Sequence, residues 1–432
     1  MKRKITENLL LWKNKVSGRM PLLVYGARQA GKTYIIREFG EQNYKNVAYF
    51  NLETNQTVSS YFSENIEPER ILRFLETESQ ERIIPGDTLI IFDEVQSCER
   101  ALTSLKYFNE KTPEYHIICA GSLLGVAINR EQYSFPVGNV DSITMFSLDF
   151  EEFLWALSEE RLCGEIKIAF ENNEALPAAL HEKALDLYKL YLIIGGMPRA
   201  VLEYVENRSL LTVPDVQNKI INDYIADMAK YATNTESVKI RAAYNSIPVQ
   251  LAKENKKFQY KLAQKGGTAT IFGAAIEWLV FAGVVLKCER LEQGFMPISV
   301  YRDLSSFKLY MSDTGLLTMK SGVSQQTILS AGEIENTFLG SVTENYVAQA
   351  LANKRYGLYY WRNEGTAELD FVLQKGDDIV AIEVKTGTRT KSKSLNMFVS
   401  KYDPAYSIRI SSKNFGFENN IKSVPLYAVF CI

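Results

Sequence analysis

Residues 21–39 read PLLVYGARQAGKTYIIREF, and this stretch decides the fold of the N-terminal part of the chain. A short apolar strand at 21–25 runs directly into GARQAGKT at 26–33, which fits the pattern G-x-x-x-x-G-K-[ST] in full. Glycine at positions 26 and 31 lets the backbone curl so that its N–H groups point inward at a phosphate. The order strand, loop and helix is the context in which this pattern predicts a phosphate-binding loop.

The loop side chains have predicted roles. Lys32 is expected to reach the β- and γ-phosphates of ATP, and the Thr33 hydroxyl is expected to bind Mg²⁺. The N-terminus of the following helix adds partial positive charge. The alternative is a glycine-rich turn with no ligand, which the flanking strand and helix disfavour. The residues predicted to bind the nucleotide are Gly26, Ala27, Arg28, Gln29, Ala30, Gly31, Lys32, Thr33 and Tyr34.

A second motif, LIIFDE at 89–94, is an apolar strand that ends in two acids. Asp93 is predicted to contact Mg²⁺, and Glu94 is predicted to orient or polarise the attacking water. A further strand ends in AGSLLG, where Ser122 is a candidate to sense the γ-phosphate or hold the water. Capping of the next helix is an equally good explanation for that serine. Nucleotide kinases and GTPases usually lack the acid at the position of Glu94, so the pair favours ATP hydrolysis.

Five apolar segments separated by helical stretches predict an α/β fold with a parallel sheet covered on both faces. The predicted strands are 21–25, 46–52, 88–92, 115–120 and 140–148. Residues from about 149 to 235 are mostly helical, with a break at GGMPRA, 195–200. Residues 236–325 combine helices with a strand pair, which suggests a small winged-helix-like unit.

Composition limits the function. The chain has 432 residues, 46% of them hydrophobic, and a net charge of −2, which predicts about three folded domains and any nucleic-acid contact only through local patches. Five cysteines without C-x-x-C spacing and only two histidines argue against zinc sites and disulfides, and suit a reducing cytosol. The apolar stretches are too short for a signal peptide or a membrane span, so a cytoplasmic protein is expected.

Near the C-terminus, residues 367–385 read AELDFVLQKGDDIVAIEVK, two apolar strands around a Lys-Gly-Asp-Asp turn. Glu383 and Lys385 share one face of the second strand because side chains alternate along it. Pairing of Gln374 with Ile379 would place Asp370 opposite Glu383, and a slip by one residue would turn Asp370 away. An ordinary hairpin with solvated charges is the alternative.

Taken together, the motifs resemble those of the prokaryotic AAA-type ATPases that carry a C-terminal restriction-endonuclease-like domain. The stretches that carry the resemblance are VYGARQAGKT, LIIFDEVQ, AGSLLG, LDFEEFL, GGMPRAV, FKLYMSDTGLL and the closing YYWRNEGTAELDFVL with IEVK. The resemblance implies an AAA+-like core at 1–160, a helical lid at 161–235, a winged helix at 236–327 and the nuclease-like domain at 328–432. It also implies that Gly196 and Pro198 of the lid lie near the adenine or ribose.

Nucleases of this type place an aspartate and then an E-x-K on adjacent strands, where the carboxylates hold Mg²⁺. Asp370, Glu383 and Lys385 fit that pattern, with Glu344 of the preceding helix as a further metal ligand. Asp370, Glu383 and Lys385 are therefore also candidate catalytic residues. The chain departs from the family at Gly138-Asn139, where an arginine often follows the glycine, and at Ser147, which stands in place of a proline.

Other basic residues are weaker candidates. Arg130 and Arg199 are candidate arginine fingers, although each has a surface or salt-bridge role as its alternative. The segments KENKKFQYK, 253–261, and KTGTRTKSKS, 385–394, are candidate DNA contacts, with core packing and a solvated basic loop as their respective alternatives.

The predicted function is Mg²⁺-dependent ATP hydrolysis coupled to a C-terminal domain that binds nucleic acid and is a candidate to cut DNA. The alternative is an ATP-dependent switch or scaffold whose C-terminal domain binds protein or DNA without cutting. A P-loop kinase for a small molecule is a third reading, which Glu94 and the winged helix disfavour. The sequence does not predict the oligomeric state.

Overall fold

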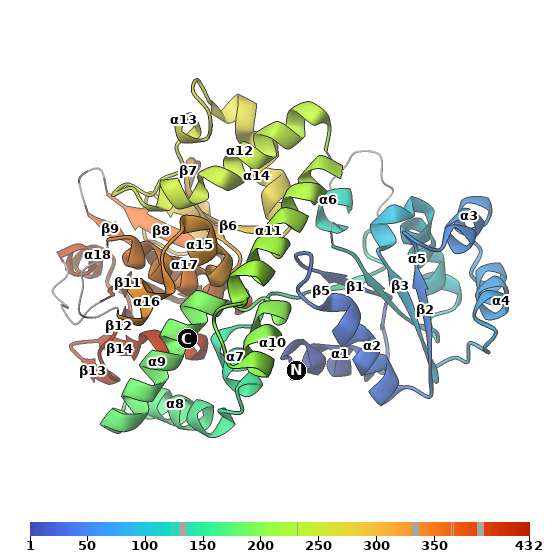
Figure 1. The fold of residues 1–432 in the computed structure, drawn as a ribbon, viewed down its shortest axis with the longest axis horizontal. Coiled ribbons are helices and arrows are strands. Elements are labelled where there is room, and N and C mark those ends of the chain that lie inside the picture. Colours follow the sequence, from blue (N-terminus) through green and yellow to red (C-terminus); the bar gives the residue numbers. More distant parts are fainter. Residues whose placement is uncertain are drawn as a thin grey trace. The chain divides into compact units, whose positions relative to one another are not determined.

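The predicted parallel sheet is present in the computed structural model of the chain, in the order β2-β3-β4-β1-β5 with every neighbouring pair parallel (Figure 1). All five strands lie within or beside the predicted segments, which confirms the α/β fold class. Their bounds are β1 Leu22–Tyr25, β2 Asn46–Asn51, β3 Thr88–Asp93, β4 His116–Ala120 and β5 Asp141–Thr144. The structure describes residues 1–122, 124–128, 136–230, 232–330, 337–363, 365, 367–386 and 393–432.

Helices cover both faces of this sheet because successive strand residues point to opposite sides. Leu22 and Val24 pack with helices α1 (Ile5–Lys13) and α2 (Lys32–Asn43). Leu23 packs on the other face with α3 (Gln56–Glu64), α4 (Pro68–Ser79) and α5 (Glu99–Lys111). Strand β3 is buried along its whole length, as expected for a central strand covered on both sides. The short elements η1 (Val95–Ser97) and α6 (Leu124–Ile128) follow β3 and β4.

The chain divides into two compact units. One comprises residues 2–147 with 281–283 and contains this sheet, and the other comprises Met1, 148–280 and 284–432. The finer division of the chain at 160, 235 and 327 remains a prediction.

The second unit begins with a series of helices, as the sequence predicts for residues 149–235. Helix α7 starts at a capping box in which Asp149 accepts from the Glu152 amide and Glu152 accepts from the Asp149 amide. No helix among the described residues is both long and apolar enough to cross a membrane. The helices are α7 Phe150–Ala156, α8 Glu160–Asn172, α9 Ala178–Ile194, α10 Pro198–Asn207, α11 Val213–Lys230, α12 Asn234–Leu251, α13 Tyr260–Ala263 and α14 Ala269–Phe281.

Two further sheets follow. A four-stranded sheet has the order β7-β6-β8-β9, and a five-stranded sheet has the order β10-β11-β12-β14-β13. Their strands are β6 Val285–Leu291, β7 Arg302–Met311, β8 Tyr359–Arg362, β9 Glu368–Leu369, β10 Phe371–Lys375, β11 Asp378–Val384, β12 Tyr406–Ser411, β13 Gly416–Glu418 and β14 Ile421–Pro425. The remaining elements are η2 Ile298–Tyr301, α15 Thr314–Ser321, α16 Gln325–Leu329, α17 Thr337–Asn353, α18 Lys393–Tyr402 and η3 Leu426–Cys431.

The four-stranded sheet joins residues of 236–327 and 328–432, which the sequence predicts to be separate domains. Strands β6 and β7 form the antiparallel pair of the predicted winged-helix-like segment, and β6 also pairs in parallel with β8 of the C-terminal segment. The edge of the strand pair is therefore covered by a neighbouring strand instead of projecting as a free wing. Because β6 pairs with both β7 and β8, side chains of β7 lie close to the C-terminal segment.

A close backbone contact within the second unit requires glycine. Gly195 ends α9 with φ 75°, and the Gly196 amide donates to Asp313 Oδ2 at 2.8 Å. A Cβ added to Gly315 would lie 2.5 Å from the Gly195 nitrogen and from the Ile194 carbonyl oxygen. The sequences GGMPR and SDTGLL thus pack directly on one another, with no room for a methyl group between them.

We predict opposite effects for two helical glycine substitutions. Gly315→Ala in α15 forces the two backbones apart and should destabilise the second unit by roughly 1–3 kcal/mol. Gly273→Ala in α14, where an added Cβ meets no atom within 4 Å, should stabilise it by about 0.5–1 kcal/mol. Thermal unfolding midpoints of the two variants check this, and equal midpoints would contradict the contact.

Candidate functional site

The loop after β1 has the backbone that phosphate binding requires. Gly26 and Gly31 adopt φ of 142° and 94°, and Gln29 lies in the left-handed region at φ 63°. A Cβ on Gly26 would lie 2.1 Å from the Met145 carbonyl oxygen, so a larger residue cannot occupy this position. Left-handed residues between right-handed ones turn backbone N–H groups to one side and form an anion-binding nest.

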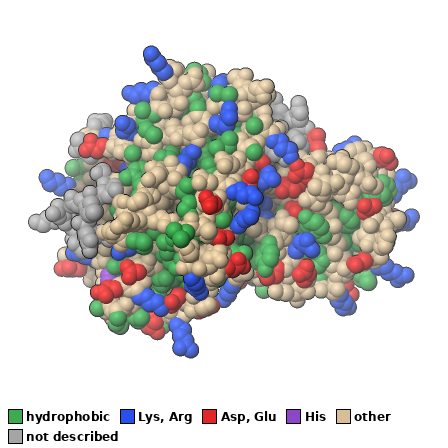
Figure 2. All heavy atoms as spheres, in the orientation of Figure 1, with side chains coloured by type: hydrophobic (Ala, Val, Ile, Leu, Met, Phe, Trp, Pro, Cys, Tyr) green, Lys and Arg blue, Asp and Glu red, His purple; other side chains and the backbone are tan. Residues whose placement is uncertain are grey.

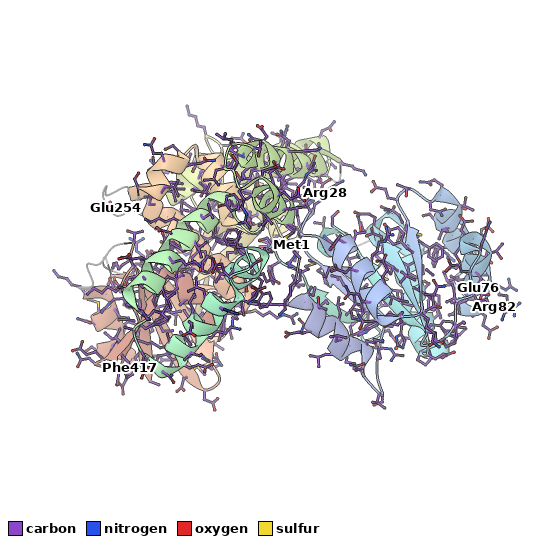
Figure 3. All side chains as sticks on the ribbon, turned by 60° about the horizontal axis from the view of Figure 1, so that its bottom comes forward. Met1, Arg28, Glu76, Arg82, Glu254 and Phe417 are labelled. Carbon is purple, nitrogen blue, oxygen red and sulfur yellow. The ribbon has the colours of Figure 1, made fainter. Side chains whose placement is uncertain are left out.

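Lys32 is the first residue of α2 and is buried. Its ammonium donates to the carbonyl oxygens of Gly26 and Ala27, each at 2.8 Å. The side chain is thus folded back over the loop, on the side where the predicted phosphates would lie. Tyr34, by contrast, is 61% exposed on the outer surface of α2 and bonds Glu38 at 3.1 Å. The loop residue Arg28 is labelled in Figure 3.

The predicted Mg²⁺ ligands meet. Thr33 Oγ1 donates to Asp93 Oδ2 at 2.9 Å, although the residues belong to different motifs. Tyr49 on β2 donates to the same oxygen at 2.7 Å. Parallel strands place their carboxyl ends at one edge, which is why the ends of β1 and β3 converge here. Hydroxyl and carboxylate oxygens are the ligands that Mg²⁺ prefers, so this pair fits the ion.

Glu94 follows Asp93 and adopts φ 49°, a left-handed conformation that is uncommon for residues other than glycine. Its Oε2 accepts from Gln96 Nε2 at 2.5 Å and from Ser122 Oγ at 3.3 Å. The structure therefore brings the two predicted residues Glu94 and Ser122 together at the ends of β3 and β4. Gln96, which is buried and holds the same carboxylate oxygen, is absent from the sequence prediction.

Arg3 is a second residue that is absent from the sequence prediction, and it contacts the backbone of the phosphate-binding loop. Arg3 is buried, and it donates to the carbonyl oxygen of Ala30 at 3.1 Å and to that of Phe146 at 2.6 Å. It links the loop to the chain that follows β5. The basic start MKRK gives a local signal of charge, but no local signal that one arginine turns inward.

Other predicted residues lie elsewhere. Gly196, Pro198 and the candidate finger Arg199 belong to the second unit, so their predicted approach to the nucleotide stays a prediction. The Gly196 amide is engaged by Asp313 within that unit. The other candidate finger, Arg130, lies outside the described residues, as do 387–392 of the basic run.

The C-terminal hairpin has the register expected from its turn. Gln374 pairs with Ile379, and Phe371 pairs with Ile382. Asp370 lies in the bend between β9 and β10, so the pairing of Asp370 with Glu383 stays a prediction. Asp370 Oδ2 accepts from the Val384 amide at 2.8 Å. Glu383 is buried, with Lys385 Nζ 3.1 Å from one carboxylate oxygen and Arg409 Nε 3.8 Å from the other.

Glu344 on α17 is buried and engaged by three donors. It accepts from Lys308 Nζ at 3.0 Å, and it also bonds Lys256 Nζ and Tyr310 Oη. Lys256 comes from the loop that contains Glu254, labelled in Figure 3. The candidate DNA segment 253–261 thus directs one of its lysines at an internal acid.

The pKa values of two nearby acids, Glu344 and Asp370, are shifted in opposite directions. Burial and the charge of Glu344 raise the pKa of Asp370 to about 7, against the opposing effects of Lys308 and Lys256. Burial opposes ionisation of Glu344 as well, but Lys308 and Lys256 outweigh it and lower the pKa of Glu344 to about 2. Glu344 is the ionised member of the pair, and Asp370 is the one that holds a proton up to neutral pH.

The predicted metal centre at Glu344, Asp370 and Glu383 stays a prediction. Glu344, Asp370 and Glu383 are all described, yet the described residues contain no group of three histidine, cysteine or acidic side chains that could hold a metal ion. The reason is that two lysines and a tyrosine hydroxyl take the carboxylate of Glu344, and a lysine and an arginine flank Glu383. The prediction of Glu344 as a metal ligand does not fit these contacts.

A phosphate-binding loop, a strand ending in Asp-Glu and a parallel sheet define the first unit as a P-loop nucleotide-binding domain of the ATPase type. Residues 18–154 match the family described as "AAA domain", and this part of the chain is an AAA-type P-loop ATPase domain. Residues 185–327 and 339–429 match two domains of unknown function, DUF8612 and DUF4143.

Among solved structures, the chain is similar to the Walker-type ATPase PABY2304 of Pyrococcus abyssi, with 16% identity over 74% of this chain and 95% of that one, at a TM-score of 0.45. It is also similar to the ORC2 protein of Aeropyrum pernix in its ADPNP–ADP complexes, with 12% identity, 79% and 93% coverage and a TM-score of 0.40. For AMPPCP-bound DnaA from Aquifex aeolicus the identity is 13%, the coverage 65% and 89%, and the TM-score 0.30. None of the curated proteins matches this chain.

We predict that Asp370→Asn removes a pH dependence of stability. Because the folded-state pKa of Asp370 is raised to about 7, its contribution is full at acid pH and is lost as the pH rises through that value. Between about pH 5 and about pH 8 the wild type should lose on the order of 2 kcal/mol relative to the asparagine variant. Glu344 titrates near pH 2 and does not contribute in this window. Parallel pH profiles of the two unfolding midpoints would contradict the raised pKa.

Proposed function

We propose that this protein hydrolyses Mg²⁺–ATP at the carboxyl edge of the sheet in its first unit. The observation that carries the proposal is the contact of Thr33 with Asp93 at 2.9 Å, beside the Glu94 carboxylate held by Ser122 and Gln96. Nucleotide loop, metal-ligand pair and acid lie together, as phosphoryl transfer to water requires.

In this proposal the loop and Lys32 bind the phosphates. The N–H groups of the loop point at the β-phosphate, and the ammonium of Lys32 exchanges its two carbonyl partners for β- and γ-phosphate oxygens. The exchange is favourable because a charge-assisted bond to phosphate is stronger than a bond to a neutral carbonyl. When bound, Mg²⁺ supplies positive charge to the phosphates, and Thr33 and Asp93 are the residues that would hold it.

Glu94 is the residue we assign to the attacking water. Its carboxylate lies at the mouth of the sheet, where it accepts a proton from water as the oxygen approaches the γ-phosphate. Gln96 and Ser122 act as positioning residues, because both donate to Glu94 Oε2 and fix its orientation. The Gln96 amide also restricts the loop after β4, since a Cβ on Gly121 would lie 2.1 Å from Gln96 Oε1.

For the C-terminal segment we propose recognition of nucleic acid without assigned cleavage. Lys385, whose side chain is 39% exposed at the end of β11, supports a contact with phosphate. Basic and acidic side chains are interspersed over the face drawn in Figure 2, which suits a local contact better than a broad basic surface. Cleavage is not proposed, because the carboxylates it needs are not grouped around a metal position.

We predict that two substitutions in the first unit separate ATP binding from turnover. Lys32→Ala should weaken ATP binding and lower steady-state turnover at least about 100-fold, since it removes a phosphate ligand. Glu94→Gln should keep ATP binding within about twofold and lower turnover by about 100-fold or more, since the amide cannot accept the proton. Phosphate release and equilibrium binding of a fluorescent ATP analogue measure the two effects.

The matched control is Glu99→Gln, the same change at an exposed glutamate at the start of α5. Its turnover should equal that of the wild type. Unchanged turnover in Glu94→Gln would remove Glu94 from the mechanism, and transfer of the γ-phosphate to an added small molecule instead of water would favour a kinase.

A further inference from the structure

The strongest unexplained feature of the second unit is a lysine in its interior. Lys308 on β7 is 0% exposed, and its Nζ lies 3.0 Å from Glu344 Oε1 and 2.7 Å from Glu368 Oε1. The same nitrogen lies 4.7 Å from the ring centroid of Tyr360. The three N–H groups of the ammonium therefore have two carboxylate oxygens and an aromatic face as acceptors.

A buried lysine without function would be costly, because its charge must be taken out of water. Here the charge is compensated, because the carboxylates of Glu344 and Glu368 both form ion pairs with the ammonium of Lys308. The surrounding geometry is thus built around a permanent positive charge.

The acidic centre around Lys308 is compensated by cationic side chains. Lys256 pairs with Glu344, and Arg362 Nη1 lies 3.8 Å from Glu368 Oε2. Two ion-paired carboxylates, Glu344 and Glu368, therefore face three cationic groups, Lys256, Lys308 and Arg362. Among the described residues, these pairs leave no negative charge of the two carboxylates for a divalent cation to neutralise.

We propose that the ammonium of Lys308 takes the place of a divalent metal ion in this acidic centre, so that the C-terminal domain folds and acts without a metal. The ammonium bridges two carboxylates from different elements, α17 and β9, as a bound cation would. A divalent ion held by the same oxygens would lie within a few ångströms of the ammonium, where repulsion between like charges is strong.

Lys308 and its two acid partners belong to different segments of the chain, so their ion pairs have a structural role. Lys308 belongs to the segment matched by DUF8612, whereas Glu344 and Glu368 belong to the segment matched by DUF4143. Strand β7 reaches the acids because β6 pairs with β7 on one side and with β8 on the other. The ammonium thereby joins the two segments through ion pairs with Glu344 and Glu368.

The test measures Mn²⁺ binding to the full chain without nucleotide. Binding is monitored through the decrease of the electron paramagnetic resonance signal of free Mn²⁺. The wild type should show no Mn²⁺ site that Asp370→Asn or Glu383→Gln removes. Lys308→Met, which keeps the length of the side chain without its charge, should gain a saturable site at least about tenfold tighter than any wild-type binding, equivalent to roughly 1.4 kcal/mol. Adding Glu344→Gln to that variant should remove the gained site.

The matched control is Lys287→Met, the same change on the neighbouring strand β6, where the lysine pairs with Glu277 at 2.9 Å. It should gain no Mn²⁺ site. A folded Lys308→Met protein that binds no Mn²⁺ would overturn the proposal.

A second measurement does not depend on the folding of any Lys308 variant. The thermal midpoint of the wild type should be the same in EDTA and in excess Mn²⁺. A midpoint that rises with Mn²⁺, with the rise abolished by Asp370→Asn, would overturn the proposal. ATP turnover is measured separately, so its loss or retention bears only on the first unit.

Discussion

The parallel direction of the five-stranded sheet is the constraint on which the proposed ATP site depends. In a parallel sheet all strands end at the same edge, so the loops after β1, β3 and β4 meet there although they lie far apart in sequence. Thr33, Asp93 and Ser122 are brought together by this single geometric fact. Reversal of one strand would move its functional residue to the opposite edge.

The second unit poses a different physical problem, which is the burial of several charges close together. Buried carboxylates are stable only when paired and hydrogen bonded, and a protein can supply the compensating charge itself or take it from a metal ion. Here Lys308, Lys256 and Tyr310 engage the carboxylate of Glu344. The buried charge of Glu344 is therefore compensated by side chains of the chain itself.

The features predicted correctly from the sequence are those with a local signal. The glycine spacing gives the loop, apolar runs give the five strands, and the length of the Lys-Gly-Asp-Asp turn gives the pairing of Gln374 with Ile379. Each depends on residues within a few positions of one another, where periodicity and turn chemistry are informative.

The residues that the sequence analysis missed depend on contacts between distant segments. In FKLYMSD, Lys308 reads as an ordinary polar residue of a strand, and its acid partner Glu344 lies 36 positions away. Arg3 is similar, because its acceptors Ala30 and Phe146 lie 27 and 143 positions along the chain. Gln96 is close to Glu94 in sequence, but only the left-handed turn at Glu94 directs the amide at the carboxylate.

The proposed ATP site requires Thr33 and Asp93 to act together on one Mg²⁺–ATP, and a double-mutant cycle measures whether they do. Mg²⁺–ATP affinity would be measured for the wild type, Thr33→Val, Asp93→Asn and the double variant. We expect a coupling energy of about 1 kcal/mol or more, because either substitution alone already disrupts binding of the shared ion. Additive effects, with a coupling energy near zero, would contradict it.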